Sequence, residues 1–422
     1  MIAPVKRVVA SVVTGLHRVQ FRFVLLALRA ASPFRRLRIA TFRADRVGHF
    51  ISETDLAIQL LKCERDRRTH EVFIFPEKVC NSYLKTLYTK ALCELPNVSV
   101  LDASTSRLAR RLLPSAQQLA DVVVTNGLSH WAYCGSPISR GIDRHGLRPS
   151  GRPHLIISDE EYSRASRVAD RLGIDLGHPY VCLQIRDSQY LADWDRSRDW
   201  SYHDYRNPDP HTYVELVREL TTRGIQVVRM GKNVAAAFPF SGQGFVDYAT
   251  SDWRSDMMDV VLYAKCALAV SGSSSGIEQM GITFNRPLVV TNLIPFADPR
   301  FAVDLHVVIP CLVRHSDSGE LLPLSRMMRS RFGKSHQYER AGLEIVRNSP
   351  EEIVDAVFET LGRADGTWIT QDNDEALQRK FWSWADACGV GEDLPNGTKE
   401  YSGHRALLGA AFLKRHEEVL LA

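Results

Sequence analysis

A segment rich in serine and glycine carries the clearest chemical signal in this sequence. A hydrophobic run ends at Val270, and small hydroxyl residues and two glycines then lead into a predicted helix: Ser271, Gly272, Ser273, Ser274, Ser275, Gly276, Ile277 and Glu278. Main-chain N–H groups at the start of a helix attract anions, and hydroxyl groups add further donors. We therefore expect a phosphate site formed by Ser273, Ser274, Ser275, Gly276 and Glu278. The alternative is a serine-rich turn that only caps the helix.

Cationic side chains accompany two other predicted strands. Arg186 and Asp187 directly follow residues 180–185, and Arg229 and Lys232 stand at the end of residues 225–230. The carboxyl ends of parallel strands share one edge of a sheet, so these groups should converge on the serine-rich segment. Arginine and lysine hold phosphate through charge-assisted hydrogen bonds. A structural Arg–Asp ion pair and a helix-capping loop are the alternatives.

Arg206 belongs to a polar and aromatic tract at residues 202–209. The tract reads Tyr-His-Asp-Tyr-Arg-Asn-Pro-Asp and has neither helical nor strand periodicity, which predicts a loop. Functional residues concentrate on such loops, and tyrosine and asparagine side chains can stack on or bond a sugar. A plain surface loop is the alternative.

A glycine–histidine motif stands in the first predicted strand–helix connection. Arg46, Gly48 and His49 follow a predicted strand at residues 37–42, and Glu53 stands just behind them. Glycine allows a sharp turn, and histidine has a pKa suited to proton transfer. We expect His49, or else Asp187, to act as a catalytic base, with Arg46, Gly48 and Glu53 on the acceptor side. A helix-capping loop is the alternative.

Metal binding finds little support in the sequence. No H-E-x-x-H motif and no zinc-type spacing of cysteine and histidine occurs. The acidic pair Asp372 and Asp374 stands in the polar carboxyl-terminal part, away from any predicted strand edge. We therefore expect no metal and no cofactor. Basic side chains and helix ends would take the place of Mg²⁺ at a diphosphate.

The pattern of hydrophobic segments predicts an α/β fold with two doubly wound, mostly parallel sheets. In the first domain, strands are expected at residues 37–42, 72–75, 98–101 and 121–125, and helices at 51–61 and 80–92. In the second, strands are expected at 180–185, 225–230, 267–270 and 287–291, and helices at 159–172, 211–222, 255–265, 275–283 and 350–362. Residues 134–154 are rich in Gly, Pro and Ser and predict a linker.

The length of 422 residues suits two domains of ordinary size. We divide the chain into a basic amphipathic helix at 1–34, a first Rossmann-like domain at 35–150 and a second at 151–348. A helical segment at 349–422 is expected to pack across the junction between the domains.

Charge is distributed unevenly along the chain. Residues 1–44 hold nine of the 53 basic residues and no acidic one, so the remainder carries 44 basic against 49 acidic residues. Residues 5–29 combine an apolar stripe with a cationic flank, which is typical of a helix lying on an anionic membrane surface. A helix that packs on the protein itself is the alternative, and nucleic-acid binding is not favoured because aromatic interleaving is thin.

The remaining composition indicates a cytoplasmic protein. No apolar run reaches the roughly 20 residues that span a bilayer. The eight cysteines are scattered without a C-x-x-C pair, and several fall in apolar strand-like runs, which is typical of free thiols in a reducing compartment. We therefore expect a peripheral location at the inner face of the cell membrane.

Several of these segments together resemble an uncharacterised bacterial family of putative glycosyltransferases associated with surface-polysaccharide genes. The resemblance runs from about residue 37 through RVGHF, CLQIRD, HDYRNPD, VVRMGK, FVDYATSDWRSD and VSGSSSG, and residues 180–296 are its most specific part. The second domain is also loosely similar to that of fucosyltransferase-like GT-B enzymes. That similarity implies that Arg186 and residues 273–275 hold a donor diphosphate. Those enzymes carry a further basic residue beside the arginine, where this chain has Asp187.

These observations lead to a functional hypothesis. The chain is expected to be a metal-independent GT-B-like glycosyltransferase whose two Rossmann-like domains face a cleft. It would transfer a sugar from a nucleotide-sugar donor to a growing surface polysaccharide or a lipid-linked glycan. A pyruvyl or phosphoglycerol transferase acting on surface glycans, or a non-catalytic nucleotide- or glycan-binding protein, are the alternatives.

Overall fold

The structure is a computed structural model that describes residues 36–63, 69–126, 155–295, 306–330, 332–371, 373–387 and 406–421, together with Phe23 and Leu26. Contacts between residues divide the chain into two units, Met1–Asp143 and Arg144–Ala422. The predicted linker at 134–154 lies outside the described residues, as does the predicted helix at 1–34 apart from Phe23 and Leu26. In the described ranges, no helix is both long enough and apolar enough to cross a membrane.

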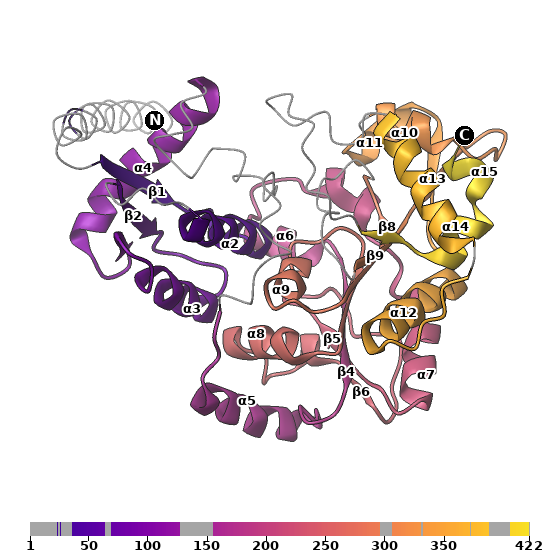
Figure 1. Ribbon diagram of the computed structural model, residues 1–422, viewed down its shortest axis with the longest axis horizontal. Helices are drawn as coiled ribbons and strands as arrows, with labels where there is room; N and C mark the ends of the chain where they lie inside the picture. Colours follow the sequence, from indigo (N-terminus) through magenta and orange to yellow (C-terminus); the bar gives the residue numbers. More distant parts are fainter. Residues whose placement is uncertain are drawn as a thin grey trace, which may run out of the picture. The chain divides into compact units, whose positions relative to one another are not determined.

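The first unit contains a parallel three-stranded sheet with helices on both faces (Figure 1). Its strands are β1 (Arg36–Thr41), β2 (Thr69–Phe75) and β3 (Val98–Asp102), and its helices are α2 (Val47–Cys63), α3 (Ser82–Cys93) and α4 (Arg107–Asn126). Side chains alternate along β2, as the pleat requires. Ile74 packs with Ala109 and Ala116 of α4, whereas Phe75 contacts Phe50 of α2.

The predicted strand at residues 121–125 is wrong, because these residues belong to helix α4. The apolar run Val122-Val123-Val124 favours a strand when it is considered alone. It is, however, the last part of a 20-residue helix that begins at Arg107 and contains Pro114. A short apolar run cannot by itself distinguish a buried strand from a helix segment.

The second unit contains a seven-stranded parallel sheet in the order β12-β9-β8-β7-β4-β5-β6. Its strands are β4 (Tyr180–Ile185), β5 (Gln226–Met230), β6 (Phe245–Val246), β7 (Leu268–Gly272), β8 (Leu288–Leu293), β9 (His306–Pro310) and β12 (Leu407–Leu408). All six residues of β4 are buried, as expected for a central strand covered on both faces. The predicted mixture of helices with mostly parallel sheets is confirmed.

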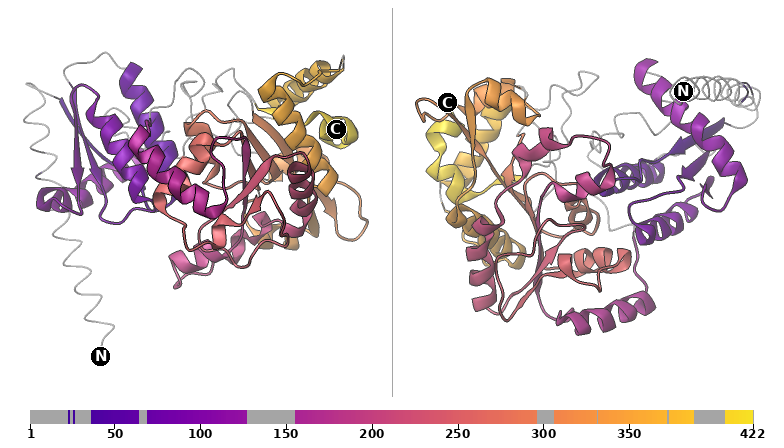
Figure 2. Two further views of the ribbon diagram at one scale, coloured as in Figure 1. Left: turned by 90° about the horizontal axis from the view of Figure 1, so that it is seen from below. Right: turned by 180° about the vertical axis from the view of Figure 1, so that it is seen from behind.

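Helices cover both faces of this sheet (Figures 1 and 2). One layer contains α5 (Asp159–Leu172), α8 (Asp256–Lys265) and α9 (Glu278–Thr283), and the other contains α7 (Val214–Thr222), α12 (Pro350–Asp365) and α14 (Ala410–Arg415). The ends of α5 follow from its sequence: Ser158 and Glu161 form a capping box, and Gly173 closes the helix at φ 72°. Ser349 and Glu352 begin α12 with a second capping box.

Shorter elements complete the second unit. They are α6 (Gln189–Trp194), the 3-10 helices η2 (Ser201–Arg206), η3 (Pro210–Tyr213) and η4 (Tyr248–Thr250), α10 (Leu324–Ser330), α11 (Ser335–Arg340), α13 (Asp374–Ala387) and α15 (Glu417–Leu420). An antiparallel pair, β10 (Leu312–His315) and β11 (Leu343–Val346), stands apart from the main sheet. It packs with η2 in a small hydrophobic cluster that contains Tyr205, Val313 and Tyr338.

Candidate functional site

The topological switch point of the second unit lies between β4 and β7. These strands are parallel neighbours, with Ile185 opposite Gly272. The next strand along the chain after β4 is β5, on one side, whereas the next after β7 is β8, on the other. Connections that leave in opposite directions open a crevice at the carboxyl ends of the strands, and ligands of open α/β sheets bind there. Arg186 and the serine-rich segment begin at this point.

Arg186 and Arg206 form a pair of neighbouring cations at the switch point. Arg186 Nη1 donates to the main-chain oxygen of His203 at 3.4 Å and to Oδ1 of Asn207, and Arg206 donates to the main-chain oxygen of Ser274. All three acceptors are neutral. Burial, and then the charge of Arg206, lower the pKa of Arg186 to about 10. The guanidinium group of Arg186 therefore remains charged at neutral pH.

The carboxylates near this pair are engaged elsewhere. Asp187 accepts the main-chain N–H of Gln189 at 2.9 Å and that of Ala235 at 3.0 Å, one on each carboxylate oxygen. Asp204 accepts the side-chain amide of Asn207 at 3.0 Å. Both carboxylates act against the lowering of the Arg186 pKa, but less than burial and Arg206 do. An anion with two negative charges would suit the arginine pair.

The serine-rich segment turns sharply where it leaves β7. Ser273 has a φ of 80°, an uncommon left-handed conformation for a residue other than glycine. Its N–H donates to the oxygen of Thr291 at 2.7 Å. Its side chain is fully buried, and its hydroxyl has no hydrogen-bond partner among the described residues. Such a strained turn with an unsatisfied hydroxyl is typical of a ligand-binding loop.

Glu278 occupies part of the loop that was expected to bind an anion. Its Oε2 accepts the N–H of Ser275 at 3.1 Å and lies 3.4 Å from the hydroxyl of Ser271. Helix α9 begins only at Glu278 and has six residues. The prediction that the helix begins at residue 275 is therefore wrong. The helix end therefore contributes less to this loop than the sequence indicated, and the arginine pair contributes more.

Arg229 lies inside the fold. Its side chain is 3% exposed, and its Nη1 contacts Asp247 Oδ2 at 3.0 Å and the oxygen of Ala236 at 2.8 Å. This is a structural ion pair. Lys232 approaches Asp256 of α8, with 4.0 Å between Nζ and Oδ1. Arg229 stands within β5 and not beyond its end, whereas Lys232 follows that strand.

The glycine–histidine motif of the first unit is helical. Helix α2 begins at Val47, so Gly48 and His49 stand in its first turn and not in the loop that was expected. Gly48 is not among the residues with positive φ, and the sharp turn assigned to it is wrong. Ser52 donates to the oxygen of Gly48 at 2.6 Å. Arg46 precedes the helix and is half-buried.

Glu53 is a buried carboxyl group that binds Arg43. Its Oε1 lies 2.7 Å from Arg43 Nε, and its Oε2 accepts the N–H of the same residue at 3.2 Å. Burial raises the pKa of Glu53 to about 7, although Arg43 acts in the opposite direction. His49 Nδ1 is 3.9 Å from Glu53 Oε1, which is beyond hydrogen-bond distance. Glu53 is therefore suited to positioning Arg43 and influencing His49.

Sequence reasoning missed several residues that hold the site together. Asn207 binds Arg186, Arg347 donates to the oxygen of Tyr205 at 2.6 Å, and Tyr213 lies against Gly272. Asn207 fell within the polar tract, but Arg347 is 142 residues from its acceptor and gives no local signal. In the described ranges, no group of three or more His, Cys, Asp or Glu side chains could hold a metal ion.

Comparisons with known proteins give distant structural similarities. The sequence matches no protein-family model and no curated protein. The glycosyl transferase family 9 protein from Veillonella parvula DSM 2008 is 11% identical, with a TM-score of 0.44, over 78% of this chain and 97% of that one. The dodecameric iron-containing heptosyltransferase TibC, in complex with ADP-D-beta-D-heptose, is 12% identical, with a TM-score of 0.36, over 80% of this chain and 79% of that one.

Proposed function

We propose that this chain is a glycosyltransferase that uses a nucleotide-sugar donor and binds the donor diphosphate at Arg186, Arg206 and the turn after β7. One observation carries the proposal: the guanidinium groups of Arg186 and Arg206 lie at the sheet's switch point, so close together that the charge of one lowers the pKa of the other. The buried hydroxyl of Ser273 supports the same site. Ser274, Ser275 and Gly276 remain part of the proposal.

The proposed chemistry is charge stabilisation of a departing nucleoside diphosphate. Breaking the bond between sugar and phosphate leaves negative charge on the diphosphate, and preorganised cations stabilise that charge as it develops. Arg186 and Arg206 would supply the positive charge that Mg²⁺ supplies elsewhere, so we propose that turnover requires no metal.

The acceptor hydroxyl needs a proton acceptor as it attacks the sugar. We propose His49 for this role, with Arg46 and Glu53 on the acceptor side, in a GT-B-like arrangement of the two units. His49 is favoured over Asp187 because both oxygens of Asp187 already accept main-chain N–H groups. The proposed acceptor is a surface polysaccharide or a lipid-linked glycan at the inner face of the cell membrane.

A panel of nucleotide sugars tests this proposal on the full chain. UDP-, GDP-, CMP-, dTDP- and ADP-sugars would be screened by thermal shift, and the best ligand followed by calorimetry and by release of free nucleotide in the presence of EDTA. We expect one nucleotide to bind and to turn over without metal. Binding that saturates without turnover would instead identify a binding protein. Binding of none of the donors would overturn the proposal.

A further inference from the structure

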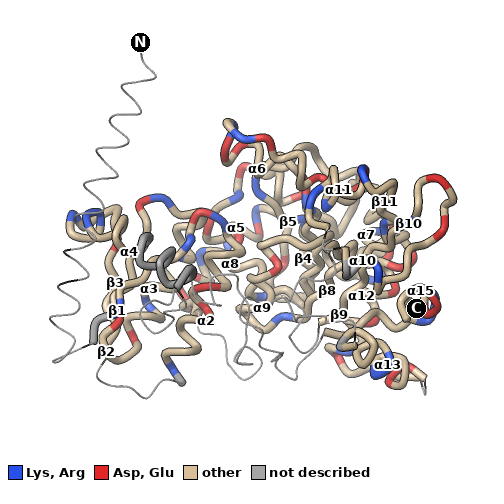
Figure 3. The backbone as a smooth tube through the Cα atoms, turned by 90° about the horizontal axis from the view of Figure 1, so that it is seen from above, with Lys and Arg blue, Asp and Glu red and all other residues tan. Residues whose placement is uncertain are grey.

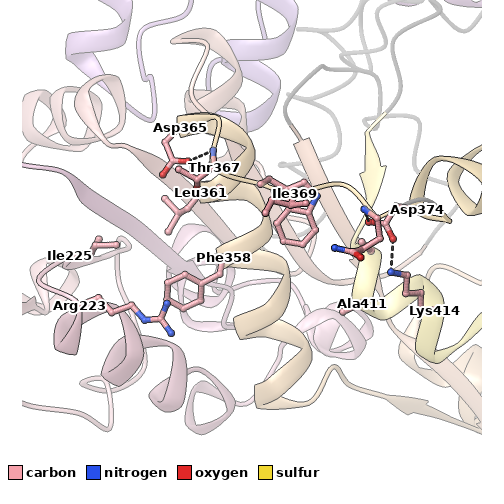
Figure 4. Close-up of a pocket in the computed structure, with 14 residues that line it drawn as sticks. Arg223, Ile225, Phe358, Leu361, Asp365, Thr367, Ile369, Asp374, Ala411 and Lys414 are labelled. Atoms are coloured by element: carbon pink, nitrogen blue, oxygen red, sulfur yellow. Dashed lines mark hydrogen bonds and ion pairs between the residues drawn. The ribbon is translucent and has the colours of Figure 1, made fainter.

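A groove lies at the end of the second unit's sheet opposite to the proposed nucleotide site. It has a volume of about 700 Å³ and is bordered by the α7–β5 turn, the last turns of α12, residues 367–371 and α14 (Figure 4). Arg223 and Ile225 precede the first residue of β5, so the groove borders the amino-terminal edge of that strand. Its volume is that of a small-molecule site.

Aromatic and aliphatic side chains form one part of the groove. The guanidinium carbon of Arg223 lies 4.1 Å from the centroid of the Phe358 ring, and that of Arg363 lies 5.2 Å from the centroid of the Trp368 ring. Ile369 is 76% exposed. The Nε1 of Trp368 is buried and has no hydrogen-bond partner within the described ranges, although tryptophan usually finds one. The groove therefore offers apolar surface together with an unsatisfied donor.

Polar side chains of both charges form the other part. Asp365 Oδ1 accepts the N–H and the hydroxyl of Thr367 at 2.9 and 2.6 Å. Asp374 pairs with Lys414, with 2.6 Å between Oδ1 and Nζ, as the dashed line in Figure 4 marks. With Arg223, the groove carries two cationic and two anionic lining residues, so its charges balance.

This combination discriminates between classes of ligand. A phosphate group would meet two carboxylates and two cations that are already paired, Lys414 with Asp374 and Arg223 with Glu219. A lipid tail would bury Asp365 and Lys414 without new partners, which is costly. A pyranose ring presents an apolar face to an aromatic side chain, while its hydroxyls both donate to carboxylates and accept from ammonium or indole groups. We propose that the groove binds a short oligosaccharide segment.

The position of the groove suggests what such binding would do. A five-residue strand is roughly 17 Å long, so a sugar in the groove lies well away from the switch point. The groove would hold a part of the glycan distant from the reacting end and keep the chain on the enzyme between transfers. In this respect alone, the inference rests on the proposed glycosyltransferase activity.

A printed array of bacterial surface polysaccharides and oligosaccharides, probed with labelled full-length protein in the absence of nucleotide, tests the groove. The variants are Trp368→Ala and Ile369→Glu. The second side chain is so exposed that its replacement should not impair folding. We expect wild-type protein to bind a defined set of glycans and both variants to lose at least tenfold in affinity for them.

Trp253→Ala is the matched control. Trp253 is 45% exposed and has Arg171 over its ring at 4.9 Å, but it lies outside the groove. The Trp253→Ala variant should bind the same glycans as the wild-type protein. If wild type binds no glycan, or if Ile369→Glu binds as well as Trp253→Ala, the inference is wrong.

A second measurement separates this inference from the proposed function. Calorimetry with the preferred nucleotide should give Trp368→Ala the wild-type affinity, whereas Arg186→Ala should keep its glycan binding on the array. If wild type binds glycans through the groove but binds no nucleotide, the groove stands and the proposed function falls. If nucleotide turns over and no glycan binds, the proposed function stands and the inference about the groove is wrong.

Discussion

Individual arginines of the second unit should separate into binding and structural groups. Arg186→Ala and Arg206→Ala remove charge-assisted bonds to a diphosphate, each of which is worth about 1.5–3 kcal/mol. We expect each variant to bind the nucleotide roughly ten- to a hundredfold more weakly, with little change in melting temperature. Calorimetry and a thermal melt measure the two effects.

Two further arginines provide the controls for this experiment. Arg198 is exposed and lies over the ring of Trp200, so Arg198→Ala should bind nucleotide as wild type does. Arg229→Ala should leave Asp247 without its buried partner and lower the melting temperature instead. Unchanged nucleotide affinity in both Arg186→Ala and Arg206→Ala would mean that the site lies elsewhere.

Glu53 should make the stability of the first unit depend on pH. Its pKa rises from 4.5 to about 7 in the folded chain, so the folded state binds this proton more tightly than the unfolded state. The stabilisation is complete below pH 4.5 and is lost as the pH rises to about 7, a change on the order of 3 kcal/mol. Glu53→Gln, which cannot ionise, should not show this loss.

Thermal melts between pH 5 and 7.5 test this prediction. The melting temperature of wild type should fall by roughly 5 °C relative to Glu53→Gln over that range. Glu94→Gln, an exposed substitution at the end of α3, is the matched control and should follow wild type. Parallel curves for wild type and Glu53→Gln would show that the buried carboxyl does not titrate in this range.

At the scale of elements, packing between β7 and η3 depends on a glycine. A Cβ atom on Gly272 would lie 2.7 Å from the hydroxyl of Tyr213 and 3.3 Å from the main-chain oxygen of Gln184. Tyr213 is fixed by bonds to Thr291 at 2.6 Å and Asn292 at 2.9 Å. Gly272→Ala should therefore destabilise the second unit by about 1–3 kcal/mol, as overpacking does.

A double-mutant cycle with Tyr213→Phe measures this contact by denaturant unfolding. Removal of the hydroxyl relieves the shorter clash, so Gly272→Ala should cost less in the Tyr213→Phe background. Gly333→Ala is the control, because nothing lies within 4 Å of a Cβ at that position. An equal cost of Gly272→Ala in both backgrounds would contradict the assigned contact.

The elements with strong local patterns could be predicted from the sequence. The strand expected at 180–185 coincides with β4, and the helix expected at 159–172 coincides with α5, because a mostly apolar run marks the first and a capping box marks the second. Strand β12 has two residues and no period to detect. The start of α2 was missed because Gly48 suggested a turn.

The candidate site could be predicted only in part, for a related reason. The sequence correctly predicted that Arg186 and the turn at Ser273 are neighbours, because both follow the ends of parallel strands and such ends share one edge of a sheet. The partner of Arg229 could not be predicted, because Asp247 stands 18 residues further along the chain and beyond the next strand. Sequence spacing identifies the edge of a sheet, but it does not tell which charged side chains the fold pairs with one another.

At the scale of the whole molecule, charge separates the beginning of the chain from the rest. Residues 1–44 hold nine basic and no acidic residues. Figure 3 shows basic and acidic positions interspersed along the described backbone of the second unit. A basic segment near an anionic membrane gains about 1 kcal/mol per Lys or Arg. Deletion of residues 1–32 should therefore release the protein from anionic vesicles while the remainder stays folded.

Flotation with vesicles that contain phosphatidylserine measures this release, and vesicles of phosphatidylcholine alone are the control. Full-length protein should float only with the anionic vesicles, and the truncated protein with neither. Equal flotation of the two proteins would assign membrane binding to another part of the chain.

The order of strands in the second unit also has a consequence for the protein while it is being synthesised. Strand β4 is the first strand of its sheet, but its neighbour β7 follows far later, and Gln184 meets Ser271 across 87 residues. A nascent chain that ends before β7 contains Arg186 and Arg206 but lacks the turn at Ser273, which is the other part of the proposed nucleotide site. Nucleotide capture by ribosome-bound chains should therefore begin only after residue 276 has emerged, and a ligand-coated resin would select finished molecules over truncated ones.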